Sequence, residues 1–470
     1  KMLRRFSLPF TAFLALLLLS GLAPRPARAT ILISLYADRL SLCAKNTPLS
    51  EVLAALARRG ISVRQAPSVN PTVSVCVSDL PIAEAVERIL KGTNYVLTWT
   101  RPEKSPGIPP RLAEIQVFPP GAPDRALPLS NSSRFSVVTL KSGAKAVKDE
   151  ILMRFPKGMT EQAINELLKK ISGSIVSYDE KTGIARISLP PDSDIEAAVA
   201  AANQAGKAKA EPNYAYPVDR STYLPGQKLF TDPNAPPVPK SGHVPVAILD
   251  TGMDAAAANM EGLVVGSLDA LDPDQPLSDN LGHGTQMALV ASGKIRPEGA
   301  KESTAFENPV VAVRAFDDQG ITTSYTLIRA VDYAVENGAR VINCSWGTST
   351  DAAFIRDSLE YAHSQGVVLV AAAGNEPTGE AVYPAAYPFV VGVGARNPLG
   401  ITWDKSNYGS SVAVIAPGFA DLPVGYEGPA GTYAGTSIAS AFVAGVVADT
   451  LSQNPDATPE EIMNAVADSF

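Results

Sequence analysis

Four short runs of almost continuous apolar residues alternate with helical patterns in the second half of the chain. They cover residues 246–249, 310–315, 340–344 and 367–373. Strands that are apolar on both faces are typical of a parallel sheet that helices cover on both sides. The sequence therefore predicts an α/β domain over residues 243–470, with a mostly parallel sheet between two layers of helices.

Polar residues stand where these strands end or where helices begin. In a parallel sheet the carboxyl ends of the strands share one edge, and ligands bind there. Asp250 and Asn375 follow two of the strands, and His283 and Ser437 lie at the starts of two predicted helices. Hydrolysis of an amide needs a nucleophile, a base, a group that orients the base, and oxyanion donors. His283, which is flanked by glycine, is the best base; Asp250 can orient it, and the Asn375 amide can stabilise an oxyanion.

Each of these residues alone also has a structural explanation. Asp-Thr-Gly and Gly-Asn are common turns, a histidine beside glycines can be structural, and Ser437 can be an ordinary helix N-cap. Free N–H groups and the positive end of the helix dipole would surround Ser437, however, and this environment suits an oxyanion. All four residues together, at the ends of elements, favour a catalytic interpretation.

The motifs around the four residues resemble those of subtilisin-like serine proteases. The motifs are Asp250-Thr251-Gly252, His283-Gly284-Thr285, Gly374-Asn375, Gly435-Thr436-Ser437-Ile438-Ala439 and the strand from Val341 to Gly347. The resemblance implies a serine endopeptidase in which Ser437 is the nucleophile and the other three residues have the roles given above.

The resemblance also implies how a substrate is bound. Its backbone would pair as an added strand with Ser345, Trp346 and Gly347 on one side and with the chain near Gly320 on the other. A side-chain pocket would be lined by small residues, which are Ala372, Ala373 and Gly374.

Residues 135–217 show the order strand, helix, strand, strand, helix, strand, which is that of a ferredoxin-like module. Thr160 is expected to cap the first helix, and Ser193 with Glu196 forms a capping-box pattern before the second. The segment ends in Glu211-Pro212-Asn213-Tyr214, and here it resembles the propeptide of subtilisin-like proteases. The resemblance implies that the segment assists folding and that its tail lies in the active-site cleft until it is cut. An ordinary ferredoxin-like domain is the alternative.

A proline-rich linker is predicted over residues 218–242, where an exposed chain is open to cleavage. We expect the protein to be made as a zymogen and to cut itself in or near residues 217–243. Its partners would be protein or peptide substrates and its own propeptide, which would act as an intramolecular inhibitor and folding aid.

Residues 1–29 have the pattern of a secretory signal peptide. Basic residues precede an apolar run that is too short for a membrane span, and Ala27-Arg28-Ala29 is a small-x-small cleavage motif. An uncleaved membrane anchor is the alternative. The signal predicts a periplasmic or extracellular location.

Residues 30–119 contain an internal repeat with an offset of 33 residues. In each copy an alternating strand containing a cysteine, Cys43 or Cys76, precedes an amphipathic helix. The repeat resembles the small secretin and TonB short N-terminal domain, which implies an α+β module that contacts an envelope partner. A spacer without a partner is the alternative. In the oxidising environment outside the cytoplasm, the two cysteines could form a disulfide bond.

Charge and cysteine content bear on partners and cofactors. The formal net charge is −7, and residues 1–29 carry five basic and no acidic residues, so the exported chain would be still more acidic and a poor ligand for nucleic acid. The three cysteines give no metal-binding spacing, and Cys344 is expected to be a buried thiol. No cofactor is required. Asp272, Asp274 and Asp279 could hold calcium, but a solvated acidic loop is the favoured interpretation.

Two other functions compete with that of a peptidase. A catalytically silent protein could use the edge of the sheet as a peptide clamp, although the complete set of four residues argues against it. A lipase-type hydrolase would require a Gly-x-Ser-x-Gly elbow, whereas Ser437 follows Gly-Thr and precedes Ile-Ala.

Overall fold

The computed structural model divides into two compact units, residues 1–131 and residues 132–470. The structure describes residues 32–36, 39–57, 61–66, 68–100, 111–121, 127–128, 134–204, 208–219, 221–224, 244–255, 258–260, 262–273, 277–301, 306–409, 411–424 and 430–467. The predicted signal peptide and most of the predicted linker lie outside these residues. Among the helices that are described, none combines the length and apolarity that a bilayer crossing requires.

The first unit is a small α+β module with two sheets and two helices. One sheet has the order β1-β2-β4 and the other the order β5-β6-β3-β7. Their strands are β1 (Leu32–Tyr36), β2 (Arg39–Pro48), β4 (Thr72–Pro81), β5 (Asn94–Thr100), β6 (Arg111–Phe118), β3 (Ser62–Gln65) and β7 (Leu127–Pro128). The helices α2 (Leu49–Ala57) and α3 (Ile82–Ile89) follow β2 and β4 directly, and both bury their apolar faces in the core of the unit.

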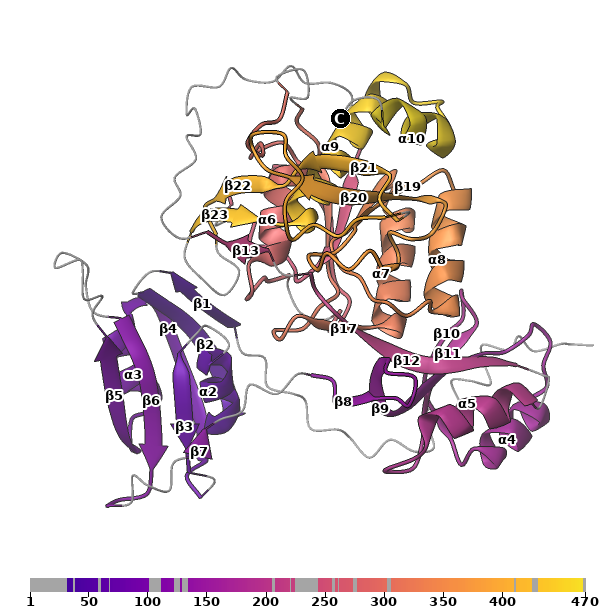
Figure 1. Cartoon of the computed structure of the whole chain (residues 1–470). Coiled ribbons are helices and arrows are strands. Elements are labelled where there is room, and N and C mark those ends of the chain that lie inside the picture. The colour runs from indigo at the N-terminus through magenta and orange to yellow at the C-terminus, as the bar shows by residue number, and fades with distance from the viewer. Residues whose placement is uncertain are drawn as a thin grey trace, which may run out of the picture. The chain divides into compact units, whose positions relative to one another are not determined.

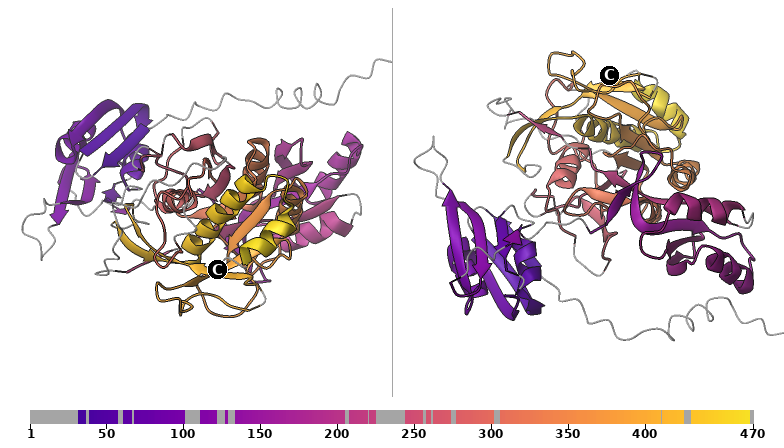
Figure 2. Two further views of the ribbon diagram at one scale, coloured as in Figure 1. Left: turned by 90° about the horizontal axis from the view of Figure 1, so that it is seen from above. Right: turned by 60° about the horizontal axis from the view of Figure 1, so that its bottom comes forward.

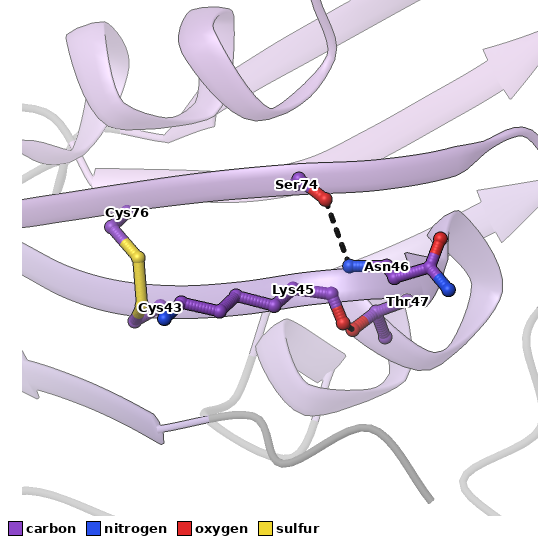
Figure 3. The surroundings of a disulfide bond; sticks show 6 residues. All are labelled: Cys43, Lys45, Asn46, Thr47, Ser74 and Cys76. Carbon is purple, nitrogen blue, oxygen red and sulfur yellow. Dashed lines mark hydrogen bonds between the residues drawn. A yellow bond between two sulfur atoms is a disulfide. The ribbon is translucent and has the colours of Figure 1, made fainter. Parts of the chain in front are cut away.

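The internal repeat forms two successive strand–helix pieces whose strands pair with each other. β2 and β4 run antiparallel, with Cys43 directly opposite Cys76. This register brings the sulfur atoms of the two cysteines, which lie 33 residues apart, together as a disulfide bond (Figure 3). The third cysteine, Cys344, is a buried free thiol, as its apolar strand predicts.

The second unit begins with the ferredoxin-like segment, called the prodomain below. Its elements follow the predicted order and are β9 (Lys145–Arg154), α4 (Glu161–Lys170), β10 (Ser174–Asp179), β11 (Ile184–Ser188), α5 (Ile195–Gln204) and β12 (Lys209–Pro217). The strands form an antiparallel sheet in the order β10-β11-β9-β12, and β8 (Val137–Thr139) also pairs with β9. The Thr160 side chain accepts a hydrogen bond from the Ala163 N–H and so caps α4, as predicted.

The start of α5 differs from the prediction. Asp194, and not Ser193, accepts the hydrogen bond from the Ala197 N–H in the first turn. The carboxylate of Glu196 accepts hydrogen bonds from the backbone N–H groups of residues 141 and 142. The capping box predicted from Ser193 and Glu196 is therefore wrong. Asp194 is an equally good cap and moves the start of the helix by one residue.

The rest of the second unit is built on a seven-stranded sheet in which every pairing is parallel, with the order β15-β16-β14-β18-β19-β20-β21. The strands are β15 (Val264–Asp269), β16 (Val310–Arg314), β14 (Val246–Asp250), β18 (Val341–Cys344), β19 (Val368–Ala372), β20 (Val390–Arg396) and β21 (Val414–Pro417). On one face lie α6 (His283–Ala291) and α9 (Thr436–Gln453), and on the other lie α7 (Ser324–Glu336) and α8 (Ala353–Ser364) (Figure 1). The predicted three-layer α/β fold is confirmed.

Three further features surround this layered core. The last described helix, α10 (Pro459–Ala467), packs beside α9 (Figure 2). A small antiparallel sheet has the order β13-β23-β22, with β13 (Thr222–Tyr223), β23 (Gly431–Ala434) and β22 (Phe419–Leu422). The prodomain strand β12 pairs with β17 (Ile321–Thr323), just before α7 (Figure 1). The prodomain sheet therefore continues into the domain that carries the predicted catalytic residues.

Candidate active site

Asp250 and His283 are brought together by the end of one strand and the start of one helix. Asp250 is the last residue of β14, and its Oδ1 lies 2.8 Å from Nδ1 of His283, the first residue of α6. Both side chains are buried. The close approach requires glycine at position 284, where a Cβ would lie 2.2 Å from the carbonyl oxygen of Gly252.

Hydrogen bonds from neighbouring residues fix this pair. The Thr251 hydroxyl accepts a hydrogen bond from the Gly284 N–H and donates one to Asp279 Oδ1. The other carboxylate oxygen of Asp279 accepts from the N–H and the hydroxyl of Thr285. These bonds tie the residues that follow β14 to the first turn of α6, so the aspartate and the imidazole keep one relative orientation.

The electrostatic environment of His283 favours a proton on the imidazole. Burial lowers the pKa of His283, but the charge and hydrogen bond of Asp250 and the charges of Asp219 and Asp279 together raise it by more, and the pKa lies above its ordinary value. Asp250 therefore stabilises the imidazolium, which is what a general base needs once it has accepted a proton.

Ser437 lies in the first turn of α9. It is the second residue of this helix, and Gly435 is the N-cap; the alternative interpretation of Ser437 as an ordinary N-cap is therefore wrong. Its hydroxyl donates a hydrogen bond to the backbone carbonyl oxygen of Asp219, at 3.0 Å. The serine thus contacts a peptide carbonyl at the positive end of a helix dipole.

Asn375 follows β19 and contacts the same residue. Its Nδ2 donates a hydrogen bond to Asp219 Oδ1, at 2.8 Å. Its Oδ1 accepts one from the Thr436 N–H, at 2.9 Å, which fixes the end of the amide that faces the site. The Thr436 hydroxyl lies 3.0 Å from Asp219 Oδ2. Side chains of Ser437, Asn375 and Thr436 therefore converge on Asp219.

The residues predicted to bind a substrate backbone contact a segment of this chain. The Val218 N–H donates a hydrogen bond to the Gly320 carbonyl, at 2.8 Å, and Val218 forms an antiparallel bridge with Trp346. The Asp219 N–H donates to the Ser345 carbonyl, at 3.2 Å. The chain's own backbone thus lies as an added strand between the two edges.

The same segment pairs again on the other side of Ser437. Thr222 and Tyr223 of β13 lie opposite Ala434 and Tyr433 of β23, the strand that leads into α9. The start of the predicted linker at residue 218 is therefore corrected, because residues 218–219 and 221–224 are docked in the site. Sequence reasoning missed them because a two-residue strand has no periodic pattern and Asp219 belongs to no motif.

Trp346 contacts an aromatic residue that precedes the docked aspartate. Its ring is buried and lies 5.8 Å from the ring of Tyr216, the residue three positions before Asp219. The Tyr216 hydroxyl lies 2.8 Å from the Ser324 hydroxyl at the start of α7. Trp346 and the first turn of α7 thus form a buried position for one side chain of β12, just before the docked segment.

The remaining predicted substrate-binding residues lie at the same edge of the sheet. Gly347 leaves no room for a side chain, since a Cβ would lie 2.4 Å from a methyl group of Val382. Ala372 ends β19, and Ala373 and Gly374 follow it. The Gly374 N–H donates to the Thr436 hydroxyl, at 3.2 Å. Their role as the lining of a side-chain pocket stays a prediction.

Two side chains of β12 cap helices of the three-layer domain. Asn213 Oδ1 accepts a hydrogen bond from the Tyr325 N–H in the first turn of α7, at 3.1 Å. Glu211 Oε1 accepts one from the Phe354 N–H in the first turn of α8, at 3.2 Å. Burial raises the pKa of Glu211 to about 7, although hydrogen bonds from the helix N–H groups oppose the shift. The prodomain therefore docks through side chains that satisfy free N–H groups of α7 and α8.

We expect the affinity of the prodomain for the three-layer domain, when the chain between them is cut, to fall as the pH rises. The Glu211 carboxyl has a pKa of about 7 when docked and an ordinary value of 4.5 when free, so the docked state holds the proton more tightly. The contribution of Glu211 to the affinity is complete below about pH 4.5 and is lost as the pH rises through 7. The affinity falls by at most about 300-fold through this residue. Gel filtration of the processed protein at pH 5 and pH 8 measures how much of the prodomain stays bound. Glu211→Gln, which keeps the acceptor oxygen, should reduce the difference, and Asp219, whose pKa burial raises to about 6, should leave a remainder of the same sign. A pH dependence that Glu211→Gln leaves unchanged would contradict the assignment.

The acidic loop does not form a metal site in the part that is described. Among the described residues, no group of three or more His, Cys, Asp or Glu side chains is placed to hold a metal ion. Asp279 instead accepts the hydrogen bonds given above, and Asp272 lies 3.9 Å from the guanidinium of Arg134. Asp274 lies outside the described residues, so calcium binding by this loop stays a prediction.

Two protein families match separate parts of the chain. The profile described as the subtilase family matches residues 241–470, and that of the fervidolysin N-terminal prodomain matches residues 134–213. The two matched regions leave out residues 30–119.

Two curated relatives and one solved structure are also similar to this chain. The thermophilic serine proteinase of Bacillus sp. (strain AK1) is 31% identical over 317 residues, which are 65% of this chain and 79% of that protein. Thermitase of Thermoactinomyces vulgaris is 33% identical over 236 residues, or 50% of this chain and 84% of that protein. The crystal structure of fervidolysin from Fervidobacterium pennivorans, a keratinolytic enzyme related to subtilisin, aligns with a TM-score of 0.57 at 24% identity. It covers 71% of this chain, which spans 59% of that structure.

Proposed function

Because this chain belongs to the subtilase family and is a subtilisin-like serine protease, we propose that it is an exported endopeptidase that is made as a zymogen. The observation that carries the proposal is the convergence on Asp219. The Ser437 hydroxyl and the Asn375 amide both donate hydrogen bonds to this residue, whose backbone is held as an added strand. The charge of the same residue acts on His283.

The proposed reaction assigns one role to each of these residues. His283 takes the proton of Ser437 as its hydroxyl attacks a peptide carbonyl, and Asp250 holds the imidazole and stabilises its positive charge. The Asn375 amide and the N–H groups at the start of α9 would stabilise the oxyanion. His283 then donates the proton to the leaving amine, and water completes hydrolysis of the acyl-enzyme.

The prodomain supports the zymogen proposal. Its last strand continues directly into the segment that lies against Ser437, and Glu211 and Asn213 anchor it on α7 and α8. The prodomain would act first as a folding template and then as an inhibitor that excludes other substrates. Self-cleavage in or near residues 217–243 would separate it from the protease domain.

A fluorophosphonate probe tests the proposed function, because it reacts with an activated serine and not with an ordinary one. The processed protein should hydrolyse casein and should carry one label, which peptide mapping would place on Ser437. The same protein denatured by heat should stay unlabelled. A processed and folded protein that takes no label would instead support the rival function of a silent peptide clamp. A label on another serine would show that Ser437 is not the nucleophile.

Export and an envelope contact complete the proposal. The signal-peptide pattern of residues 1–29 supports a periplasmic or extracellular location, and so does the Cys43–Cys76 disulfide, since such bonds persist in oxidising compartments. The α+β module of residues 30–119, with its secretin- and TonB-like repeat, would bind an envelope partner.

A further inference from the structure

The docked segment presents one particular peptide carbonyl to the catalytic serine. Among the described residues, the carbonyl oxygen that Ser437 contacts is that of Asp219, at 3.0 Å. We propose that the chain is processed at the bond between Asp219 and Arg220, and that the carboxylate of Asp219 slows this cleavage by occupying the oxyanion donor. The inference rests on the proposed peptidase function.

The strand register supports the position of the bond. Before it, the N–H groups of Val218 and Asp219 donate to the carbonyls of Gly320 and Ser345. After it, Thr222 pairs with Ala434 and the Leu224 N–H donates to a carbonyl of β23. Both flanks are thus held as added strands, and the Asp219 carbonyl that Ser437 contacts ends the first of them.

The cleavage itself needs only the groups of the site and water. Ser437 Oγ forms a bond to the carbonyl carbon of Asp219 while its proton passes to His283. The carbon–nitrogen bond to Arg220 then breaks, and the amine of Arg220 leaves with the proton from His283. Water hydrolyses the ester, which frees the α-carboxylate of Asp219 and restores Ser437.

The side chain of Asp219 competes with this reaction. Asn375 Nδ2 is needed for the oxyanion that forms on the Asp219 carbonyl, but it donates to Asp219 Oδ1, at 2.8 Å. The Thr436 hydroxyl lies 3.0 Å from Oδ2 and holds the carboxylate in place. The Asp219 carboxylate occupies the Asn375 donor, and its negative charge repels the oxyanion that would form on the Asp219 carbonyl. Loss of one oxyanion donor typically costs about 10²- to 10³-fold in rate.

The carboxylate is charged under ordinary assay conditions. Burial raises the pKa of Asp219 to about 6, while hydrogen bonds from Thr436 and Asn375 and the charge of His283 oppose the shift, and Glu376 adds to it. At pH 8 the Asp219 carboxylate is therefore ionised. Replacement of Asp219 by an uncharged residue at this pH tests whether the negative charge slows the cleavage.

The test follows self-processing of the full chain at pH 8 after refolding from denaturant, by gel and intact mass. The first cut should give a fragment that ends at Asp219 and one that begins at Arg220. Asp219→Ala should process about 10- to 100-fold faster than the unmodified chain, and Asp219→Asn, which keeps the shape without the charge, should also process faster. Asp456→Ala, at an exposed loop position, should process at the unmodified rate.

A double-mutant comparison shows whether the effect passes through the oxyanion donor. In an Asn375→Ala background the acceleration by Asp219→Ala should shrink at least threefold, because the donor that it frees is absent. A first cut at another bond, or rates for Asp219→Ala and Asp219→Asn no faster than the unmodified rate, would overturn the inference. If the processed protein still hydrolyses casein, the proposed function stands and only this inference fails; if it does not, the proposed function fails as well.

Discussion

Replacement of Ser437 by alanine is expected to leave the chain as an uncut precursor. The hydroxyl of Ser437 contacts the carbonyl of the docked segment, and alanine has no atom with which to attack it. Removal of the nucleophile from a serine protease triad costs about 10⁶-fold in kcat, so a cut made in seconds would need weeks. Production in a host that lacks its own extracytoplasmic proteases, followed by immunoblotting against both ends of the chain, measures the result.

A matched serine on the same helix provides the control. Ser452 lies near the end of α9, where its hydroxyl donates to the Ala448 carbonyl within the helix. Ser452→Ala should mature like the unmodified chain. If Ser437→Ala matured at the normal rate in the same host, self-processing would be refuted, and another enzyme would have to make the cut. Resistance of the purified Ser437→Ala precursor to limited digestion by the active enzyme would show that the variant is folded and that the segment is docked.

The fold could be predicted because its signals are local. Each strand of the parallel sheet is buried on both faces, so its sequence is an apolar run, as in Val246–Asp250. The residues that follow such runs must lie at one edge of the sheet, which is why Asp250 and Asn375 could be expected at the same edge from the sequence. The repeat of the first unit likewise put Cys43 and Cys76 at equivalent positions, but whether they pair depends on strand register, which no local pattern gives.

The docked segment could not be predicted because its conformation is imposed by its partner. Asp219 is an ordinary polar residue after a proline and a valine, and β13 has two residues, too few for a periodic signal. Its extended form comes from hydrogen bonds to carbonyls of Gly320 and Ser345, which are a hundred or more positions away in the sequence. The cap of α5 was missed for a smaller reason, since Ser193 and Asp194 are both good caps and local sequence does not choose between them.

Replacement of Asp250 by asparagine is expected to lower kcat by about 10⁴-fold while the fold is retained. Asp250 Oδ1 lies 2.8 Å from His283 Nδ1, which keeps the second nitrogen of the ring available as the base. An asparagine amide that donated to Nδ1 would select the wrong tautomer, and it could not stabilise the imidazolium by charge. The variant would be too slow to process itself, so it should be cut by immobilised unmodified enzyme before hydrolysis of a peptide substrate is measured.

The pH profile separates this role from a merely structural one. Activity requires neutral His283, so kcat/KM rises with pH through the pKa of this residue, which Asp250 raises above its ordinary value. Loss of the aspartate charge should therefore move the acid limb of the profile to lower pH, in addition to lowering its plateau. Asp404→Asn, at an exposed position, should change neither. A lower plateau with an unmoved acid limb would mean that Asp250 supports the local structure without acting on the proton of His283.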